Sequence, residues 1–431
     1  MPRFALTRRK FLLAGGLGGA LLAGGVGYWA HREGIRFGLI GAGGRGDDLA
    51  RNLRYARVLP LYADLVAVCD VDSAAATRLR DANGVRGEVY QDYRKMLQRD
   101  DIQAVIIATC EHWHVPIAVA AMRAGKAVYC EKPLGLTITE GQRVVQTARE
   151  TKAVFAMGTQ QRSFAAFRTA CELVRNGRLG PIAKVLVTLA EQGKEGGPFA
   201  AAPVPPGLDW DMWLGQAPLA PYCLERHKGW HNWWEYGGGE LMNWGIHHVD
   251  IVQWALGFEQ TGPRTIEGQA VLPRIAGGYN VPKCYSANLV YADGTVLEIR
   301  STHSDRCGIL FQGEKGNLFV DRGGCFGKAM EELPHNPLPS DAVRLHPSTP
   351  TGIFKFANIY HLQQFMRCIK TGERPLCDAA TAHRSTSVCH LANIAIRLGR
   401  KLTWDPQREQ FVNDPEADAM RARTQRSPYV L

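Results

Sequence analysis

The sequence predicts an α/β protein with a doubly wound parallel sheet in its N-terminal part and an α+β domain with an open, mostly antiparallel sheet in its C-terminal part. Three observations lead to this prediction. Short apolar strands alternate with helical stretches between residues 35 and 158. A glycine-rich turn, Gly41–Gly46, lies between the first strand and the first helix. After residue 160 the alternation stops, and Asp293-Gly294 separates two strand-like segments, as in an antiparallel hairpin.

The chain of 431 residues is long enough for two domains that each have a core. We expect residues 1–33 to be an N-terminal leader, residues 34–158 to form the first domain and residues 159–431 to form the second. The last predicted helices of the chain are free to pack back on the first domain. We find no internal repeats.

The N-terminal leader has the features of a twin-arginine (Tat) export signal. Arg8-Arg9-Lys10-Phe11-Leu12 precedes an apolar run that extends to about Ala30. Repeated glycines make this run weakly hydrophobic for a membrane span, and Gly25-Val26-Gly27 is the best small-x-small cleavage site. We therefore expect export by the Tat machinery to the periplasm or beyond, with the leader either cleaved or kept as a membrane anchor.

Composition argues against several functional classes. The formal net charge is +10, but Lys and Arg form no block of the kind that binds nucleic acid, so we expect no nucleic-acid partner. The eleven cysteines contain no C-x-x-C pair, which argues against a zinc ribbon or a disulfide framework. The pairs His112/His114 and His227/His231 lack Cys or carboxylate companions, so we expect no metal site.

The elements of the first domain follow from its apolar runs and their periodicity. We expect strands at Arg36–Ile40, Leu65–Cys69, Ala104–Ala108, Ala127–Cys130 and Val154–Met157, and helices at Asp48–Arg54, Ala74–Asp81, Tyr93–Gln98, Pro116–Arg123 and Ile138–Glu150.

The second domain has a different pattern, with longer loops and paired strands. We expect helices at Phe164–Asn176, His248–Leu256, Ile359–Thr371 and Thr381–Leu398, and strands at Val185–Ala190, Tyr285–Tyr291, Thr295–Thr302, Ile309–Gln312 and Asn317–Val320. Residues 191–240 and 323–352 are rich in Gly and Pro, and we expect both to be loops.

The glycine-rich turn has the spacing of the dinucleotide-binding fingerprint of a Rossmann fold. Gly41 permits the tight turn, Gly43 lets the backbone approach a pyrophosphate, and Gly46 lets the helix pack on the sheet. The start of the helix, with Gly44 and Arg45, offers free N–H groups to the phosphates. The sequence therefore predicts a nicotinamide dinucleotide as cofactor.

Asp70 indicates which dinucleotide is bound. It ends the second strand, about 24 residues after Gly46, where a carboxylate can accept hydrogen bonds from both ribose hydroxyls. A carboxylate there disfavours a 2′-phosphate, so we expect NAD. The guanidinium of Arg45 is able to meet a phosphate, which leaves NADP open as the alternative.

Two clusters are candidates for the chemistry. The first is Cys130-Glu131-Lys132-Pro133, at the carboxyl end of a predicted strand, where the ligand crevice of a doubly wound sheet lies. The Lys132 amine can take a proton from a substrate hydroxyl if its pKa is lowered. In the second cluster, residues 237–250, a helix would put Asn243 and His247 on one face, which suits His247 as an acid or base.

These clusters resemble the Gfo/Idh/MocA family of glucose-fructose oxidoreductase and inositol dehydrogenase. The resemblance rests on Gly41–Gly46, on Glu131-Lys132-Pro133 and on the G-G-G-x-L-x-N-x-G-x-H-x-x-D pattern at 237–250. Residues 158–162, 209–215 and 230–236 are similar to a Tat-exported bacterial branch of that family. The resemblance implies that Lys132 and His247 handle the proton while nicotinamide C4 takes the hydride, and that the chain forms a dimer or tetramer.

The resemblance also implies further cofactor contacts and one departure. Residues Thr109 to His114 resemble the family's loop after the third predicted strand, so Thr109, His112 and His114, with Glu131, are expected to contact the cofactor. The family often has Asp where this chain has Asn243, and an amide cannot carry the charge that would raise the basicity of Lys132 or His247.

Aromatic and polar side chains near these clusters are candidates for binding a carbohydrate, because aromatic rings suit the C–H faces of sugars. One loop holds His227, Trp230, His231, Trp233, Trp234 and Tyr236, and Gln161 and Arg162 follow the last predicted strand of the first domain. We expect these substrate contacts: Gln161, Arg162, Trp234, Tyr236, Asn243 and His248.

Three functions remain open from the sequence alone. The first is an exported dehydrogenase or reductase of a sugar, polyol or glycoside with a tightly held cofactor. The second is a glycoside-cleaving enzyme that oxidises its substrate transiently and shows no net redox change, with Tyr236 or His248 as a further acid or base. The third is a sugar or dinucleotide sensor without catalysis, which would tolerate the loss of Lys132.

Overall fold

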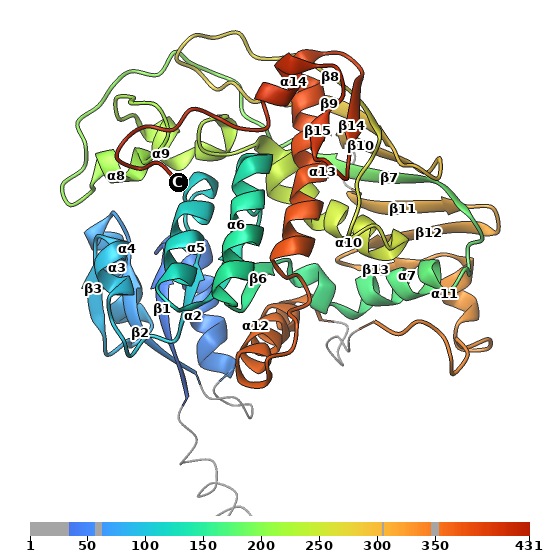
Figure 1. Ribbon diagram of the computed structural model, residues 1–431, viewed down its shortest axis with the longest axis horizontal. Coiled ribbons are helices and arrows are strands. Elements are labelled where there is room, and N and C mark those ends of the chain that lie inside the picture. The colour runs from blue at the N-terminus through green and yellow to red at the C-terminus, as the bar shows by residue number, and fades with distance from the viewer. Residues whose placement is uncertain (1–33, 57–62, 304–305, 346–352) are drawn as a thin grey trace, which may run out of the picture.

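The computed structural model describes residues 34–56, 63–303, 306–345 and 353–431. The predicted export signal lies outside the described residues. Within the described residues, no helix is both long and apolar enough to cross a bilayer. The two sheets predicted from the sequence are both present, one parallel and one mostly antiparallel (Figure 1).

The first sheet is parallel throughout, and its strands in the described part of the chain run in the order β3-β2-β1-β4-β5-β6. Its strands are β1 (Ile35–Ile40), β2 (Ala63–Cys69), β3 (Glu88–Tyr90), β4 (Ala104–Ile107), β5 (Ala127–Glu131) and β6 (Phe155–Gly158). The chain changes direction between β1 and β4, the point at which a doubly wound sheet binds its ligand. β3 was not predicted, because three residues are too few to show a period.

Helices cover both faces of the first sheet, which explains why strands such as β4 are buried on both sides. The helices are α2 (Gly44–Ala56), α3 (Ser73–Ala82), α4 (Tyr93–Leu97), α5 (His114–Arg123) and α6 (Ile138–Thr151). Side chains of α2 and α3 share one core with the long helix α12 (Phe354–Thr371), whereas α4, α5 and α6 belong to the core on the other face. The side chain of Asp72 begins α3 by accepting from Ala75 N.

The second sheet runs in the order β13-β12-β11-β7-β10-β9-β8-β14-β15 among the described residues, with β7 and β10 parallel and the other pairs antiparallel. Its strands are β7 (Ile182–Ala190), β8 (Thr265–Ala270), β9 (Tyr285–Val290), β10 (Val296–Thr302), β11 (Gly308–Gly313), β12 (Gly316–Asp321), β13 (Gly324–Phe326), β14 (Leu402–Asp405) and β15 (Gln410–Phe411). Burial alternates along β7, so one face of this sheet carries the core.

The remaining helices connect the two sheets. They are α7 (Ala165–Arg175), α8 (Trp210–Leu214), α9 (Leu224–Lys228), α10 (Ile246–Leu256), α11 (Lys328–Glu332), α13 (Ala379–Leu398) and α14 (Pro415–Ala419). Helix α13 is buried on nearly every side and packs against α6, α10 and β8 (Figure 1). It ends at Gly399, which takes the left-handed conformation predicted for a helix stop. Thus α12 and α13, from the C-terminal part of the chain, pack on the first sheet and its helices.

Two segments that were expected to be loops contain short elements. Residues 191–240 hold α8, α9 and a 3-10 turn, Trp230–Asn232. Residues 323–352 hold β13 and α11. β13 forms because its neighbour β12 offers it a hydrogen-bonding edge, which local composition does not reveal.

The C-terminal segment, residues 426–429, packs against α8 and against Trp113 of the first domain. Arg426 donates to Asp211 Oδ1 (2.7 Å) and Gly215 O (3.0 Å), both at α8. The ring of Tyr429 lies edge-on to Trp113, with centroids 5.6 Å apart. In Figure 1 this last segment runs across the top of the molecule to α8 and α5.

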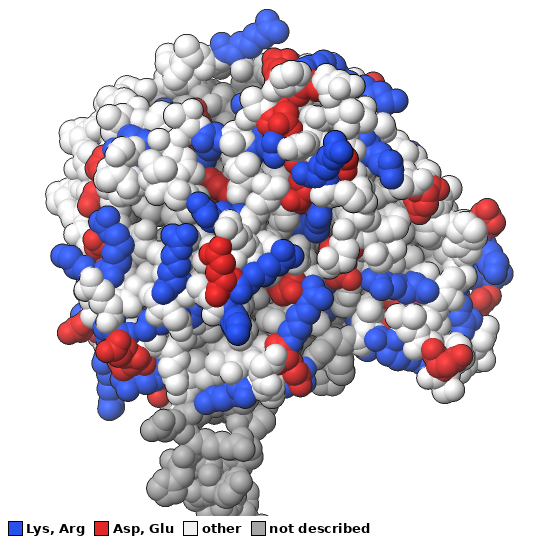
Figure 2. All heavy atoms as spheres, in the orientation of Figure 1, with Lys and Arg blue, Asp and Glu red and all other residues white. Residues whose placement is uncertain are grey.

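The surface of the viewed face mixes both charges. Figure 2 shows Lys and Arg side chains interspersed with Asp and Glu, without a continuous basic stripe. The net charge of +10 is therefore not gathered into one patch on that face.

Candidate active site

A cavity of about 620 Å³ lies at the carboxyl ends of the first sheet's central strands and extends to the second domain. Eleven of the residues predicted from the sequence line it: Gly41, Gly43, Gly44, Arg45, Asp70, Thr109, His114, Glu131, Lys132, Asn243 and His247. This is the volume range of pockets that bind small molecules and cofactors. Among the described residues, no group of three or more His, Cys, Asp or Glu side chains is arranged to bind a metal ion.

The glycines of the turn differ in the space around them: a Cβ would overlap other atoms at Gly41 and Gly46, but not at Gly43 or Gly44. Gly41 has φ of +102°, and a Cβ there would overlap Ala108 O. A Cβ at Gly46 would overlap Gly41 O, so Gly46 permits the close packing of α2, as predicted. Gly43 and Gly44 face open space, with no atom within 4 Å of a Cβ placed at either. The turn therefore leaves room for a pyrophosphate at the start of α2.

Asp70 is fixed at the other end of this turn. Its two carboxylate oxygens accept from Ala42 N (2.6 Å) and Asp72 N (2.9 Å). Burial raises the pKa of Asp70, although these two N–H groups act in the opposite direction. The carboxylate lines the cavity, so the position fits the ribose of a bound dinucleotide.

Arg45 is already paired within the protein. Its Nε and Nη2 both donate to Glu131 Oε1, at 2.9 and 2.8 Å, and Nη2 also donates to Asn358 Oδ1 at 3.3 Å. Burial acts to lower the pKa of Arg45, but the charge and hydrogen bond of Glu131, together with the charges of Tyr129 and Asp48, more than offset burial, and the pKa is raised. The guanidinium that left NADP open therefore has a carboxylate partner, and the residues present fit NAD.

Lys132 lies at the end of β5 and is held by one residue. Its Nζ donates to Asn243 O (2.6 Å) and to Asn243 Oδ1 (2.9 Å). An ammonium has three donor positions, so one position remains for a ligand in the cavity. Burial lowers the pKa of Lys132, against the charges of Glu111, Glu131 and Glu240, which act to raise it.

His247 faces the same cavity from helix α10. Its ring is buried, and its Nδ1 has no hydrogen-bond partner among the described residues. Burial lowers the pKa of His247 well below its usual value, and the nearby charge of Lys132 lowers it further. His247 is therefore neutral at pH 7 and able to accept a proton or to donate a hydrogen bond.

A wide turn of helix brings Lys132, Asn243 and His247 together. Residues Leu241–Gly245 form a π-helical turn that leads directly into α10. Such turns are rare and are frequent at functional sites. The sequence predicted a helix with Asn243 and His247 on one face, and both residues do line the cavity.

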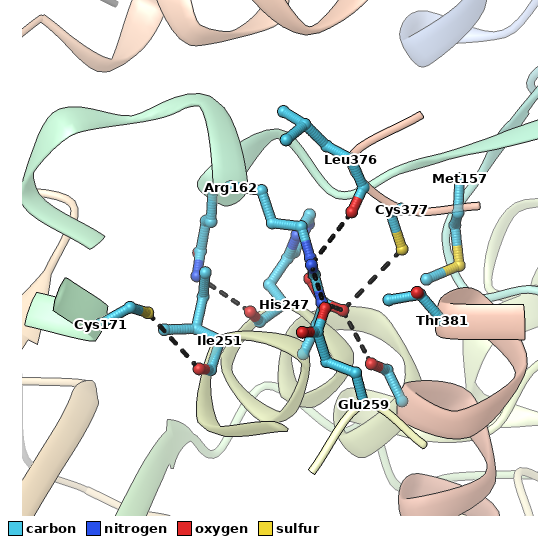
Figure 3. Close-up of polar contacts among 12 residues, drawn as sticks. Met157, Arg162, Cys171, His247, Ile251, Glu259, Leu376, Cys377 and Thr381 are labelled. Atoms are coloured by element: carbon cyan, nitrogen blue, oxygen red, sulfur yellow. Dashed lines mark hydrogen bonds and ion pairs between the residues drawn. The ribbon is translucent and has the colours of Figure 1, made fainter. Parts of the chain in front are cut away.

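Arg162 does not line the cavity, and its prediction as a substrate contact is wrong. The side chain is 1% exposed and forms a double hydrogen bond with Asp250, at 2.7 and 2.8 Å. Its Nη1 donates to Glu259 Oε1 (2.7 Å) and Leu376 O (3.0 Å), as the dashed lines in Figure 3 show. Because every side of the guanidinium is occupied, Arg162 holds α10 to its neighbours instead of binding a ligand.

Three more predicted contacts are buried and do not line the cavity. Gln161 is buried and donates to His247 O (3.1 Å), so it supports His247 from behind. His248 packs on Phe167 and is within 3.4 Å of Gln161 Nε2. His112 is within hydrogen-bond distance of Trp213 O (2.8 Å), and burial lowers its pKa to about 3.

The two aromatic residues predicted from the loop, Trp234 and Tyr236, also do not line the cavity. The Tyr236 hydroxyl accepts from Arg226 (3.1 Å) in a buried aromatic cluster, and Arg397 covers the ring of Trp234 at 5.1 Å. The sequence showed that aromatic residues gather in this loop, but it did not show which of them turn inward. Those that do include Trp230 and His231.

Several residues that line the cavity were not predicted from the sequence. Arg322, Phe354 and Asn358 come from the end of β12 and the start of α12, far from every fingerprint. No local sequence pattern marks these three residues, because tertiary packing brings them to the cavity. For Phe354 and Asn358, that packing is the contact of α12 with α2. Glu111, within residues 109–114, and Trp244, within residues 237–250, also line the cavity.

Comparisons with known proteins bear on both halves of the chain. Residues 35–159 match the family model described as "Oxidoreductase family, NAD-binding Rossmann fold". Residues 190–431 match the model described as "Oxidoreductase family, C-terminal alpha/beta domain". These models cover the turn, Asp70 and Lys132 on one side and Asn243 and His247 on the other.

Individual relatives are more distant. An inositol 2-dehydrogenase of Salmonella typhimurium is 30% identical over 147 residues, which are 34% of this chain and 43% of the relative. A glycosyl hydrolase family 109 protein of Saccharopolyspora erythraea is 36% identical over 141 residues, 30% of this chain and 28% of the relative. The match therefore spans less than half the length of these curated relatives.

Solved structures share the fold. The WlbA dehydrogenase of Bordetella pertussis, crystallised with NADH and UDP-GlcNAcA, superposes with a TM-score of 0.63 at 20% identity, over 87% of this chain and 98% of that one. At this identity the likeness establishes the fold. Together with the family model, it identifies the N-terminal part of this chain as an NAD-binding Rossmann domain.

Proposed function

The chain belongs to the Gfo/Idh/MocA oxidoreductase family, and we propose that it transfers hydride between a hydroxyl-bearing carbon of a sugar, polyol or glycoside and a tightly held NAD. The observation that carries the proposal is that Lys132 and His247 face one cavity whose far end is formed by Gly43, Gly44 and Asp70. Bound NAD would supply the acceptor for hydride at nicotinamide C4.

In this proposal Lys132 takes the proton of the substrate hydroxyl. When neutral, Lys132 keeps two N–H groups for Asn243 O and Oδ1 and directs its lone pair to the remaining position. Asn243 thus aims the amine without adding a charge, which favours the neutral form that a base requires. His247, neutral and with Nδ1 unpaired, orients the hydroxyl or shares the proton.

The test is to release small molecules from purified protein and identify them by mass spectrometry. We expect NAD, and Lys132→Ala should keep NAD while losing about 10²- to 10⁴-fold in turnover of the best substrate in a sugar panel. A protein that neither contains nor binds NAD(H) would contradict the proposal. A Lys132→Ala variant with unchanged turnover would remove Lys132 from it.

Glycoside cleavage with transient oxidation is a second candidate, favoured by the similarity to the glycosyl hydrolase family 109 protein. It requires a further acid or base in the cavity. Tyr236 and His248, which we expected in that role, do not line the cavity, whereas His231 and Glu111 do, with His231 Nδ1 3.8 Å from Glu111 Oε1. Release of phenol from aryl glycosides without net NADH, lost in His231→Ala, would select this function.

We further propose that the protein is exported by the Tat pathway and forms a homo-oligomer. Export is supported by Arg8-Arg9 and the apolar run that follows. Cell fractionation of an Arg8→Lys, Arg9→Lys variant should find the protein retained in the cytoplasm.

Oligomerisation is supported by the partly exposed face of the second sheet, and light scattering should give the mass of a dimer or tetramer.

A further inference from the structure

Arg322 is a cation in the cavity that the proposed reaction does not use. It follows β12 and lines the cavity together with Lys132 and His247. Its guanidinium carbon lies 4.3 Å from the ring centroids of both Trp244 and Phe354. Its Nε donates to Gln161 Oε1 at 3.3 Å. The side chain is therefore held in one place by two aromatic rings and one hydrogen bond.

No carboxylate of the described residues forms an ion pair with Arg322. The adjacent carboxylate of Asp321 accepts from Gly323 N (2.8 Å) and Gly324 N (3.0 Å) instead. Burial, and then the positive charge of Arg45, lower the pKa of Arg322 to about 10. A guanidinium has five N–H donors, and only one of those of Arg322 has a hydrogen-bond partner among the residues that the structure describes. A partly buried cation with free donors is the complement of an anionic ligand.

Arg322 is also close to the reacting end of the cavity. Gln161, which accepts from Arg322, donates to His247 O at 3.1 Å. The ring of Trp244, which Arg322 covers, meets the ring of His247 edge-on at 6.2 Å. A group bound to Arg322 would thus belong to a molecule that also reaches His247.

We propose that Arg322 binds a carboxylate of the substrate, so that the substrate class is the acidic sugars rather than neutral ones. This inference rests on the proposed function, because it concerns the substrate half of the same cavity. The planar fork of a guanidinium matches a carboxylate through two parallel hydrogen bonds. The rings of Trp244 and Phe354 contact the guanidinium and restrict its orientation.

The experiment measures sugar binding to the NADH-loaded protein by calorimetry. The probes are D-glucuronate against D-glucose, and D-galacturonate against D-galactose. We expect the acidic sugar of at least one pair to bind about 10- to 100-fold more tightly than its neutral partner. Arg322→Gln should abolish this difference by weakening the binding of the acidic sugar, and Arg322→Lys should keep part of it.

The matched control is Arg397→Gln, which also removes an arginine stacked on a tryptophan but lies outside the cavity. It should leave the preference for acidic sugars intact. NADH affinity is measured for each variant by fluorescence, because the pyrophosphate is the other anion within the cavity. If Arg322→Gln fails to fold, Arg322→Lys carries the test.

Several results would overturn the assignment. Equal binding of acidic and neutral sugars by the wild type is one, and a loss of NADH affinity in Arg322→Gln as large as the loss for the acid is another. Tighter binding of D-glucose 6-phosphate than of either acid would reassign Arg322 to a phosphate. Hydride transfer to or from neutral sugars together with no preference for acidic sugars would overturn this inference alone, whereas acid-selective binding without any hydride transfer would overturn only the proposed function.

Discussion

Arg162 and Arg322 are both largely withdrawn from water, and they differ in what their guanidinium groups face. Arg162 is enclosed by Asp250, Glu259 and a backbone carbonyl (Figure 3). Arg322 is enclosed by two aromatic rings and an amide, and it turns its free donors to the cavity. An arginine that is withdrawn from water and paired with carboxylates of the protein therefore has a structural role, whereas one without such partners indicates a binding site for an anionic ligand.

Arg162→Met should produce the largest effect on stability. It leaves Asp250 buried without its partner, which costs about 3–5 kcal/mol in the free energy of unfolding. Urea denaturation followed by circular dichroism measures this loss. The exposed ion pair of Arg36 with Asp101 supplies the control, since Arg36→Met should cost less than about 1 kcal/mol. A stable Arg162→Met variant with a raised KM would return Arg162 to the substrate site.

Gly46 and Gly43 form a similar pair, in which one position is enclosed by the protein and the other is open to the cavity. Gly46→Ala places a methyl group against Gly41 O and should destabilise the protein by about 1–3 kcal/mol. Gly43→Ala places the same group in open space, so stability should stay unchanged while NADH affinity falls. Thermal unfolding and NADH titration of the two variants separate the effects. Equal loss of stability in both would show that Gly43 is structural as well.

Asn243→Asp tests whether Lys132 works because its partner is uncharged. Oxidation requires neutral Lys132, so kcat/KM for oxidation should rise with pH until the pKa of Lys132, which burial holds below 10.5, is passed. A carboxylate at 243 stabilises the ammonium and should move this limb to higher pH by about 1–3 units. The pH profile of sugar oxidation measures the shift, and Asn288→Asp, at an exposed side chain of β9, should not produce it. An unchanged pH profile would mean that a group other than Lys132 determines the rise of kcat/KM with pH.

Arg322→Met should produce the smallest effect on stability. It breaks no ion pair, so the free energy of unfolding should change by less than about 1 kcal/mol in the same urea experiment as Arg162→Met. The contrast between the two variants is the direct measure of the comparison. A loss of several kcal/mol would show that Arg322 supports the packing of β12 against α12.

The fold and the reacting centre were predictable because both depend on local patterns. The doubly wound parallel sheet, the turn at Gly41–Gly46 and the position of Asn243 and His247 in one cavity with Lys132 follow from strand ends, glycine spacing and helical periodicity. Arg162 was misplaced because the chain turns inward directly after β6, so that a residue at a strand end points to Asp250. Arg322 was missed because only tertiary packing brings β12 and α12 to the cavity.

Residues 426–429, which lie late in the sequence, pack against α8 and against Trp113 beside the nucleotide cavity. Trp113 lines that cavity, and the ring against which it rests is that of Tyr429. During translation the first sheet emerges roughly three hundred residues before this support, and folding proceeds from the N-terminus. A growing chain that has not yet made this segment therefore lacks the support behind Trp113, and we expect firm retention of the dinucleotide to begin only after residues 426–429 have been made and have packed there.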